Sequence, residues 1–324
     1  MEKPEQMIAE NEAKNRKSDE AAPTSCVDSV SPISSSNQAS TSGVISTKVT
    51  GANKGIGYAI VRTLAKTVDN AIVYLTARNV QLGQTSMQKV IKELGNAQKS
   101  EVEFHQLDIT DEGSCAAIAD HLKQKHGNID VLINNAGFAF SNDAKEPPHI
   151  QAQVTIDINY YGTKRISRHL QPLIKDYGRV VNICSTIGRL NSFDIGGRNF
   201  NGYGGDWAAV LSSPHVTEEQ IDQFVEAYKK ACLDNNREEL GFPTSAYRIS
   251  KSAAIAYTIL QSRLLKFRNI TVNACCPGYV DTDMSNHKGL LTIDEGADTP
   301  VYLATAADVP NGEFVFERKV VSWY

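Results

Sequence analysis

Short runs of β-branched and aliphatic residues alternate along the chain with stretches in which apolar residues recur every three or four positions. The runs predict strands, and the helical spacing predicts amphipathic helices. Strands that alternate with helices build right-handed βαβ units and a parallel sheet covered on both faces. We therefore expect an α/β fold with a doubly wound parallel sheet. The expected strands are residues 71–76, 102–107, 130–134, 179–184 and 270–275, and the expected helices include residues 56–68, 84–94, 111–125 and 148–175.

Two segments interrupt this alternation. Residues 1–43 are rich in Ser, Asn, Gln, Glu and Lys, and they bury too little apolar surface to offset their ordering entropy, so we expect a disordered tail. Residues 189–243 contain several glycines and then a helical stretch at 217–232. This segment is too long for an ordinary loop. We therefore expect one domain, residues 44–324, with an insert at 189–243 close to its functional site.

The first expected strand has an unusual composition. A central strand of a parallel sheet is normally a near-continuous apolar run. Here Ser46, Thr47 and Lys48 stand just before a glycine-rich loop. An unpaired buried lysine is costly and tends to lose its charge or to leave the sheet. We therefore expect a short or frayed strand and a poorly anchored loop.

The glycine-rich loop, residues 50–57 (TGANKGIG), follows this strand and begins a helix. Gly51 permits a tight turn, and Gly55 and Gly57 let the backbone approach a pyrophosphate at the helix N-terminus. Such a pattern can be a simple turn, but the strand–turn–helix context favours a dinucleotide site. The sheet is then of the Rossmann type.

The end of the second strand bears on the choice of cofactor. A site for NAD has a carboxylate about 20 residues after the glycines, which binds the ribose 2′-hydroxyl. This chain has Arg78 there, with no acidic residue in residues 75–78. An arginine pairs with a 2′-phosphate, and Lys54 in the glycine loop supplies a second positive charge. The alternative is that both are solvated surface bases; the missing carboxylate favours NADP.

Two further strand ends carry polar or small residues. Asp108 ends the third strand, where its carboxylate could accept a hydrogen bond from an adenine amino group or cap the following helix. Residues 134–137 (NNAG) end the fourth strand. Their small side chains would let the chain pass beside a ribose, or they form only a turn.

Candidate catalytic residues lie in the second half of the chain. Tyr247 and Lys251 are four residues apart on an expected helix and so share one face. A nearby ammonium lowers the tyrosine pKa, normally about 10, toward the range useful for proton transfer. Ser185 ends a strand, where ligands of open α/β sheets bind, and Asn159 could hold a proton-relaying water. The Tyr-x-x-x-Lys pattern alone is common, and it can also be a packed aromatic beside a surface lysine.

These motifs together resemble the short-chain dehydrogenase/reductase family. The resemblance covers about residues 49–324 and rests on TGANKGIG (50–57), NNAG (134–137), YRISK (247–251) and PGYVDT (277–282), with Asn159 and Ser185. Within the family, the chain is most similar to monomeric NADPH-dependent carbonyl reductases. That similarity rests on the long insert and on FHQLDI (104–109), CCPG (275–278) and ERKVVSW (317–323).

The resemblance implies an oxidoreductase that reduces ketones, aldehydes and quinones with hydride from NADPH. It makes Tyr247 the proton donor, Lys251 the group that lowers its pKa and holds the nicotinamide ribose, and Ser185 the group that orients the carbonyl. Asn159 completes the proton relay. The implied cofactor-binding residues are Gly51, Asn53, Lys54, Gly55, Ile56, Gly57, Arg78, Asp108, Ile109, Asn135, Ala136, Gly137, Tyr247, Lys251, Pro277, Gly278, Val280 and Thr282. The implied substrate-binding residues are Phe140, Ser141, Asn142, Gln151 and Ser185.

Composition limits the classes of binding partner and the cellular compartment that we expect. The chain is 41% hydrophobic and 22% charged with a net charge of −4, so nothing indicates nucleic acid or an anionic membrane as a partner. No apolar run is long enough for a membrane span. The N-terminal residues resemble neither a secretory signal nor a mitochondrial transit peptide. The six cysteines show no metal-ligand spacing, so we expect reduced thiols, no metal and a cytoplasmic protein.

The insert also bears on the assembly state. Many relatives pair through helices beside the active site, and an insert helix with Phe224, Val225, Tyr228 and Leu233 could cover that surface, so we expect a monomer.

The unusual first strand favours a catalytically impaired nucleotide-binding or interaction module, whereas the intact catalytic residues favour an enzyme. An NADP-dependent alcohol dehydrogenase working in the oxidative direction is a further alternative.

Overall fold

The computed structural model describes residues 45–141, 143–190, 201–202 and 205–324. The tail expected at residues 1–43 lies outside the described residues, and so do Asn142 and part of the insert.

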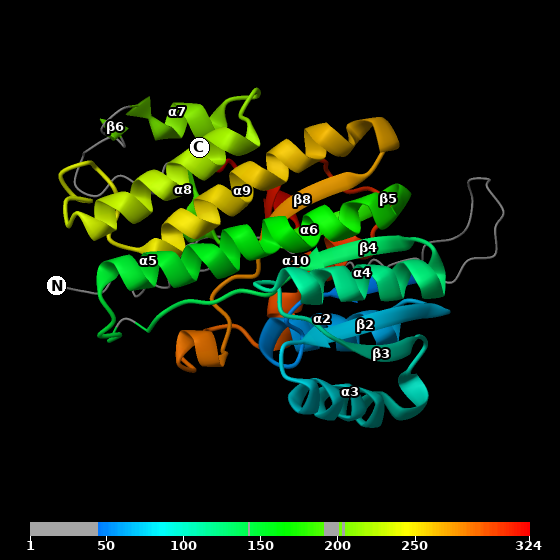
Figure 1. Ribbon diagram of the computed structural model, residues 1–324. Coiled ribbons are helices and arrows are strands. Elements are labelled where there is room, and N and C mark those ends of the chain that lie inside the picture. The colour runs from blue at the N-terminus through cyan, green and yellow to red at the C-terminus, as the bar shows by residue number, and fades with distance from the viewer. Residues whose placement is uncertain (1–44, 142, 191–200, 203–204) are drawn as a thin grey trace, which may run out of the picture.

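An eight-stranded sheet forms the centre of the molecule, in the order β10-β9-β8-β5-β4-β1-β2-β3 (Figure 1). Neighbouring strands are parallel except for β10, which is antiparallel to β9. From β1 the chain first adds β2 and β3 on one side of the sheet, and it then adds β4, β5 and β8 on the other side. The expected doubly wound sheet is therefore confirmed. The strands are β1 (Ile45–Val49), β2 (Ala71–Ala77), β3 (Glu101–Gln106), β4 (Ile129–Asn134), β5 (Ile174–Ile183), β8 (Thr271–Cys276), β9 (Phe314–Phe316) and β10 (Lys319–Val320).

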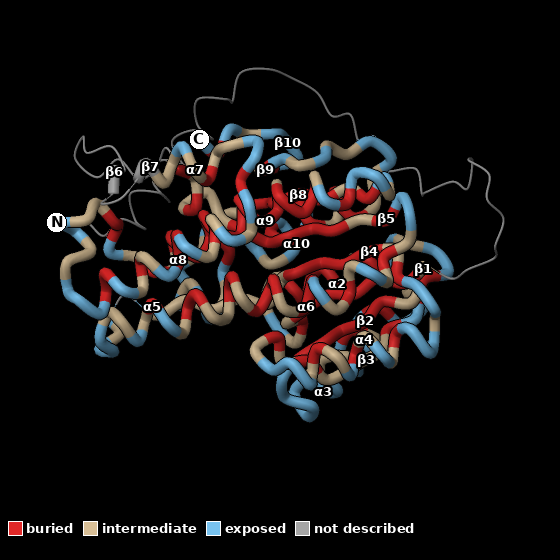
Figure 2. Tube along the Cα trace, turned by 45° about the horizontal axis from the view of Figure 1, so that its top comes forward, coloured by how far each residue is buried: buried red, intermediate tan, exposed pale blue. Residues whose placement is uncertain are grey.

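Helices cover both faces of the sheet, and the strands between them are buried (Figure 2). Successive strand residues point to opposite faces: Leu132 packs in a cluster with Ile118 of α4, whereas Ile133 packs in a cluster with Ile60 of α2. One face carries α2 (Gly55–Thr67), α3 (Val80–Leu94) and α10 (Ile293–Thr305), and the other carries α4 (Glu112–His126), α5 (Pro148–Ile156), α6 (Thr163–Leu170) and α9 (Ala246–Leu265). Within the described ranges, no helix combines the length and the apolar character needed to cross a membrane.

The helix expected at 148–175 differs from the observed one in two places. A π-helical turn, η2 (Asp157–Gly162), separates α5 from α6. The helical segment then ends at Leu170, because Pro172 lies in the following short turn, η3 (Gln171–Leu173), and cannot continue an α-helix. β5 therefore begins at Ile174 rather than near residue 179. The C-terminal strands β9 and β10 were not expected from the sequence.

The first strand has five residues and is shorter than β2, β3 and β4, but it is not frayed, so that part of the expectation is wrong. All five residues of β1 pair with β2, and three of them pair with β4. Lys48 is fully buried, between Tyr74 and Leu132 on the neighbouring strands. Burial lowers the Lys48 pKa well below its ordinary value, and its Nζ has no hydrogen-bond partner in the described part of the chain. The sheet thus accommodates the side chain in a form that loses its charge readily.

The described part of the insert places a long helix against the catalytic half of the domain. It contains α7 (Trp207–Ser212) and α8 (Glu218–Leu233), and a short hairpin of β6 (Asn201–Gly202) and β7 (Gly205–Asp206). α8 lies on α5 and α9 (Figure 1), and it buries Phe224, Val225 and Tyr228 as expected. Leu233 is 62% exposed, so its expected burial is wrong; it is the last residue of α8.

Candidate active site

The glycine loop and the end of β4 are tied together where the strand order reverses. The Thr50 hydroxyl oxygen accepts hydrogen bonds from the backbone N–H groups of Asn135 and Ala136, each at 2.9 Å. The Asn135 amide in turn donates to the carbonyl oxygens of Thr50 and Gly51, at 2.9 and 3.0 Å. The loop is therefore firmly anchored, contrary to the expectation drawn from β1. Such a switch point is where open α/β sheets bind ligands.

Close backbone contacts explain two glycines of this loop. Gly51 has φ of +60°, and a Cβ there would lie 2.8 Å from the Cα of Ala136. A Cβ on Gly57 would lie 2.4 Å from the side-chain amide nitrogen, Nδ2, of Asn135. At the start of α2, Lys54 makes no side-chain capping hydrogen bond. The first N–H groups of α2 are thus available for an anion such as a pyrophosphate.

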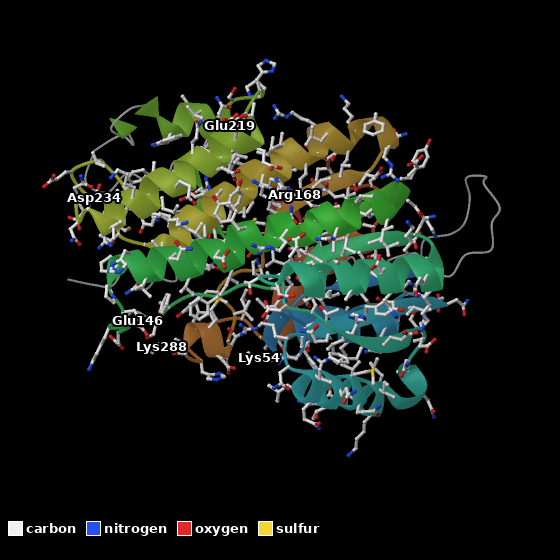
Figure 3. The ribbon with its side chains drawn as sticks, viewed as in Figure 1. Lys54, Glu146, Arg168, Glu219, Asp234 and Lys288 are labelled. Atoms are coloured by element: carbon white, nitrogen blue, oxygen red, sulfur yellow. The ribbon has the colours of Figure 1, made fainter. Side chains whose placement is uncertain are left out.

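The two basic residues expected at a 2′-phosphate are in different situations. Arg78 directly follows β2 and is exposed, and its guanidinium forms no ion pair with any residue that the structure describes. Figure 3 labels Lys54, which lies at the start of α2. Lys54 is paired, because its Nζ lies 2.6 Å from an oxygen of Asp283. The same contact lowers the pKa of Asp283. No pattern in the sequence indicates this pair, since the two residues belong to distant segments.

Asp108 and Ile109 lie at the end of the third strand, beside the site. One carboxylate oxygen of Asp108 accepts hydrogen bonds from the backbone N–H and the hydroxyl of Thr110, at 2.9 and 2.7 Å. The cap of α4 is Asp111, so the alternative role of Asp108 as that cap is wrong. Ile109 is buried, and its carbonyl oxygen accepts a hydrogen bond from Arg165.

Tyr247 and Lys251 share one face in the first turns of α9. The Lys251 ammonium lies 5.4 Å from the centre of the Tyr247 ring and donates a hydrogen bond of 2.9 Å to the carbonyl oxygen of Ile183, at the end of β5. Lys251 is 5% exposed, and burial lowers its pKa. Tyr247 is partly exposed, as a group that meets a substrate must be.

Ser185 directly precedes the short turn η4 (Thr186–Gly188), which packs against α9. Its hydroxyl oxygen accepts a hydrogen bond from the N–H of Ile187 at 3.4 Å. A Cβ on Gly188 would lie 2.7 Å from the backbone of Lys251, and Ser252 donates a hydrogen bond to the carbonyl of Gly188 at 2.8 Å. The turn after Ser185 therefore rests on α9 at Lys251. Sequence reasoning missed this contact, for which the small residue three positions after Ser185 was the available signal.

Asn159 extends from the π-helical turn toward the end of β4. Its Oδ1 accepts from the N–H of Phe138 at 2.7 Å, and its Nδ2 donates to the carbonyl of Phe138 and to the hydroxyl of Ser250, at 2.8 and 3.0 Å. A Cβ on Gly137 would lie 3.3 Å from Oδ1 of Asn159 and 3.7 Å from Nζ of Lys251, so the three residues meet. Because both amide hydrogens have protein partners, only Oδ1 keeps a lone pair for a relay.

The expected substrate-binding residues are only partly brought together. Phe140 packs edge-on against Phe138 at 4.9 Å between ring centres, which places it close to the segment held by Asn159. The Gln151 amide donates a hydrogen bond to the carbonyl of Glu146 at 2.8 Å, and Ser141 is exposed. Asn142 lies outside the described residues.

The segment after β8 lies against the glycine loop. A Cβ on Gly55 would be 3.3 Å from the Thr282 methyl carbon, and Val280 is buried. A cavity of about 470 Å³ opens beside this segment, lined by Cys276 and Pro277 and by residues of α10 and of the turn after β9. In the described ranges, no group of three or more His, Cys, Asp or Glu side chains could hold a metal ion.

Comparisons with known proteins match this arrangement. The sequence model of the short chain dehydrogenase family matches residues 47–197 and 238–290. Carbonyl reductase (NADPH) 1 of Homo sapiens is 39% identical over 293 residues, which are 87% of this chain and 99% of that protein. Carbonyl reductase (NADPH) 3 of Mus musculus is 37% identical over 282 residues, 85% of this chain and 97% of that protein. The structure of salutaridine reductase from Papaver somniferum aligns with a TM-score of 0.72 and 30% identity, over 84% of this chain and 99% of that chain.

Proposed function

The chain belongs to the short chain dehydrogenase family, and we propose that it reduces carbonyl compounds to alcohols with NADPH. The observation that carries the proposal is the meeting of Tyr247, Lys251 and Asn159 beside the anchored glycine loop. The names of its relatives, which describe NADPH carbonyl reductases, support the same activity.

The residues around the loop fit a dinucleotide. A Cβ at Gly51 or Gly57 would clash with Ala136 or Asn135, so glycine lets the loop pack tightly against the end of β4. The N-terminus of α2, which no side chain caps, can then face a pyrophosphate. NADPH supplies the hydride when it is bound. The N-terminus of α2 would hold the pyrophosphate, and Arg78 and Lys54 would hold the 2′-phosphate. Asp108, Ile109, Ala136 and the segment with Pro277, Val280 and Thr282 would line the rest of the cofactor.

Orientation of the carbonyl and transfer of the proton are assigned to four side chains. Ser185 donates a hydrogen bond that orients the substrate carbonyl oxygen, and Tyr247 gives that oxygen a proton. The charged ammonium of Lys251 stabilises the Tyr247 phenolate that results. Because the pKa of Lys251 is lowered, this ammonium readily donates a proton that restores the Tyr247 hydroxyl. Asn159, through Oδ1, connects Lys251 to the relay that restores this proton. Phe140 and Gln151 would border the substrate.

The ground for a catalytically impaired interaction module was the composition of β1. Because β1 is fully paired and the glycine loop is anchored, no observation now favours that alternative. We propose further that the protein acts as a cytoplasmic monomer. Support comes from α8, which covers α5 and α9, and from the five described cysteines, which are all buried and form no disulfide among the described residues.

The consumption of NADPH in the presence of a quinone or a diketone tests the proposal. We expect Tyr247→Phe to lower kcat by about 10²–10⁴-fold, the usual contribution of a general acid, while NADPH still binds. Tyr257→Phe, which changes a buried tyrosine further along α9, is the control and should keep most of the activity. Near-normal turnover of Tyr247→Phe would contradict the assignment, and no NADPH consumption by the wild type with any carbonyl compound would contradict the activity.

A further inference from the structure

The π-helical turn η2 is attached to the protein on two opposite sides. Asn159 points to Phe138 and Ser250, on the side of the active site. The next residue, Tyr160, is fully buried on the side of the insert, and its hydroxyl donates a hydrogen bond of 2.8 Å to Asp222 of α8. Consecutive residues of one turn therefore connect the proposed proton relay to the insert helix.

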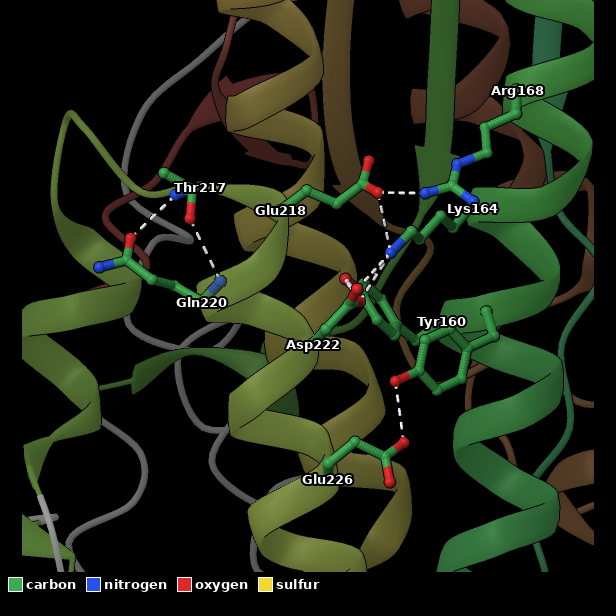
Figure 4. A network of polar contacts seen from close by, with 9 residues as sticks. Tyr160, Lys164, Arg168, Thr217, Glu218, Gln220, Asp222 and Glu226 are labelled. Atoms are coloured by element: carbon green, nitrogen blue, oxygen red, sulfur yellow. Dashed lines mark hydrogen bonds and ion pairs between the residues drawn. The ribbon is translucent and has the colours of Figure 1, made fainter.

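Asp222 also binds Lys164, the second residue of α6. The Lys164 ammonium lies 2.7 and 2.6 Å from the two oxygens of Asp222 and 2.9 Å from Glu218, and the Lys164 side chain is only 6% exposed (Figure 4). Asp222 thus contacts one side chain within η2 and one in the first turn of α6. Desolvation and the hydrogen bond to Asp222 raise the Tyr160 pKa, so its hydroxyl keeps its proton and remains a donor.

The geometry of a π-helical turn depends on such tertiary contacts. The turn departs from the regular i→i+4 hydrogen-bonding pattern of the helices on either side. Such turns occur mostly singly inside α-helices and are frequent at functional sites. A group that relays protons must lie within hydrogen-bonding distance of its partners, and a misplacement of 1 Å can cost about 10²-fold in rate. A contact that fixes η2 therefore affects the position of Asn159.

We propose that Asp222, a residue of the insert, is a positioning residue for Asn159 and thereby for the proton relay to Lys251. This inference rests on the proposed function, since it presupposes that Asn159 takes part in the relay. It gives the insert helix a part in the reaction in addition to covering α5 and α9.

The same helix provides a matched control. Glu226, one turn after Asp222, accepts a hydrogen bond of 2.8 Å from the hydroxyl of Tyr161, the residue that follows Tyr160. Glu226 is 52% exposed and contacts Lys229 of its own helix rather than a buried lysine. Asp222 and Glu226 thus make the same kind of contact with the same turn. Tyr160 is fully buried whereas Tyr161 is partly exposed, and only Asp222 also binds the buried Lys164.

The test compares Asp222→Asn, Glu226→Gln and Asn159→Ala in the full-length protein, each alone and combined in pairs with Asn159→Ala. We expect Asp222→Asn to lower kcat by about tenfold to a hundredfold and to leave the NADPH dissociation constant unchanged. The solvent deuterium isotope effect on kcat should rise, as it should in Asn159→Ala, because proton transfer becomes limiting. The double variant should be no slower than Asn159→Ala alone, and Glu226→Gln should change none of these quantities.

The outcomes separate the two proposals. If Asn159→Ala keeps the wild-type kcat, the relay assigned to Asn159 is wrong and the positioning role of Asp222 is overturned with it. Two results would overturn only the role of Asp222 while Asn159→Ala is slow. In the first, Asp222→Asn keeps the wild-type kcat and isotope effect; in the second, the decreases in kcat of Asp222→Asn and Asn159→Ala add up in the double variant. Should Asp222→Asn fail to fold, Tyr160→Phe removes the hydroxyl contact alone and leaves the ion pair with Lys164. The same decrease in kcat and increase in isotope effect are then required of Tyr160→Phe.

Discussion

The ammonium of Lys54, in the glycine loop, lies 2.6 Å from the carboxylate of Asp283, in the segment that follows β8. Both side chains are largely exposed. In the proposed function Lys54 is one of the two bases that bind the 2′-phosphate, so Asp283 competes with the cofactor for this charge. We expect Asp283→Asn to tighten NADPH binding by up to about fivefold, because an exposed ion pair contributes at most about 1 kcal/mol. Titration of the protein with NADPH and NADH measures the effect.

The control for this prediction is Asp281→Asn, which removes a carboxylate that contacts His287 instead of Lys54. Asp281→Asn should leave the ratio of NADPH to NADH affinity unchanged. An unchanged ratio in Asp283→Asn would show that Lys54 does not contact the 2′-phosphate.

Arg78 is predicted to set the preference for NADPH. Arg78→Asp replaces an attraction to the 2′-phosphate with a repulsion, and hydrogen bonds to charged groups contribute about 1.5–3 kcal/mol. We expect the NADPH dissociation constant to rise by about tenfold to a hundredfold, with a much smaller change for NADH. Lys66→Asp, an exposed change in the last turn of α2, is the control. An equal loss for both cofactors would contradict the role given to Arg78.

The assembly state follows from the position of α8. Phe224, Val225 and Tyr228 are buried between α8 and the helices α5 and α9, so the surface of α5 and α9 that α8 covers is not available to a second chain. We expect light scattering to give the mass of one chain, 35.4 kDa, over a wide range of concentration. A stable dimer or tetramer would contradict this prediction.

The residues at strand ends were predictable from the sequence, whereas the contacts between them were not. Thr50, Asn135 and Ser185 each follow a strand, and a parallel sheet brings such ends to one edge. The pair of Lys54 and Asp283 joins segments that no periodic pattern relates. For the same reason Asp222 and Tyr160 were not connected from the sequence.

Local irregularities were also beyond sequence reasoning. The apolar spacing of residues 148–175 predicts one helix, and it does not show that the turn with Asn159 is π-helical. The residues around Lys48 predict a frayed strand, because a buried lysine is unfavourable. The sequence does not show the pairing of β1 with β2 and β4, which holds the strand in place.

The last prediction concerns the stability of β1. Lys48 is buried without a hydrogen-bond partner among the described residues, and burial lowers its pKa well below the ordinary value of about 10.5. Lys48→Met keeps a long unbranched side chain and removes the cost of burying the amine. We expect the melting temperature of the cofactor-free protein to rise at neutral pH. Lys123→Met, a change at an exposed lysine in the last turn of α4, is the control and should leave it almost unchanged.

The gain from Lys48→Met should depend on pH, and its sign follows from proton binding. Below about pH 10.5 the unfolded chain holds a proton on Lys48, whereas the folded chain, with its lowered pKa, releases it over part of that range. Unfolding then takes up a proton, so raising the pH between the folded pKa and 10.5 stabilises the wild type, by up to about 1.4 kcal/mol per pH unit. Lys48→Met lacks this dependence, and its advantage in the free energy of unfolding should therefore shrink as the pH approaches 10.5. Denaturant unfolding of both proteins at several pH values measures this. A constant difference, or a less stable Lys48→Met, would mean that Lys48 is solvated and charged in the native protein.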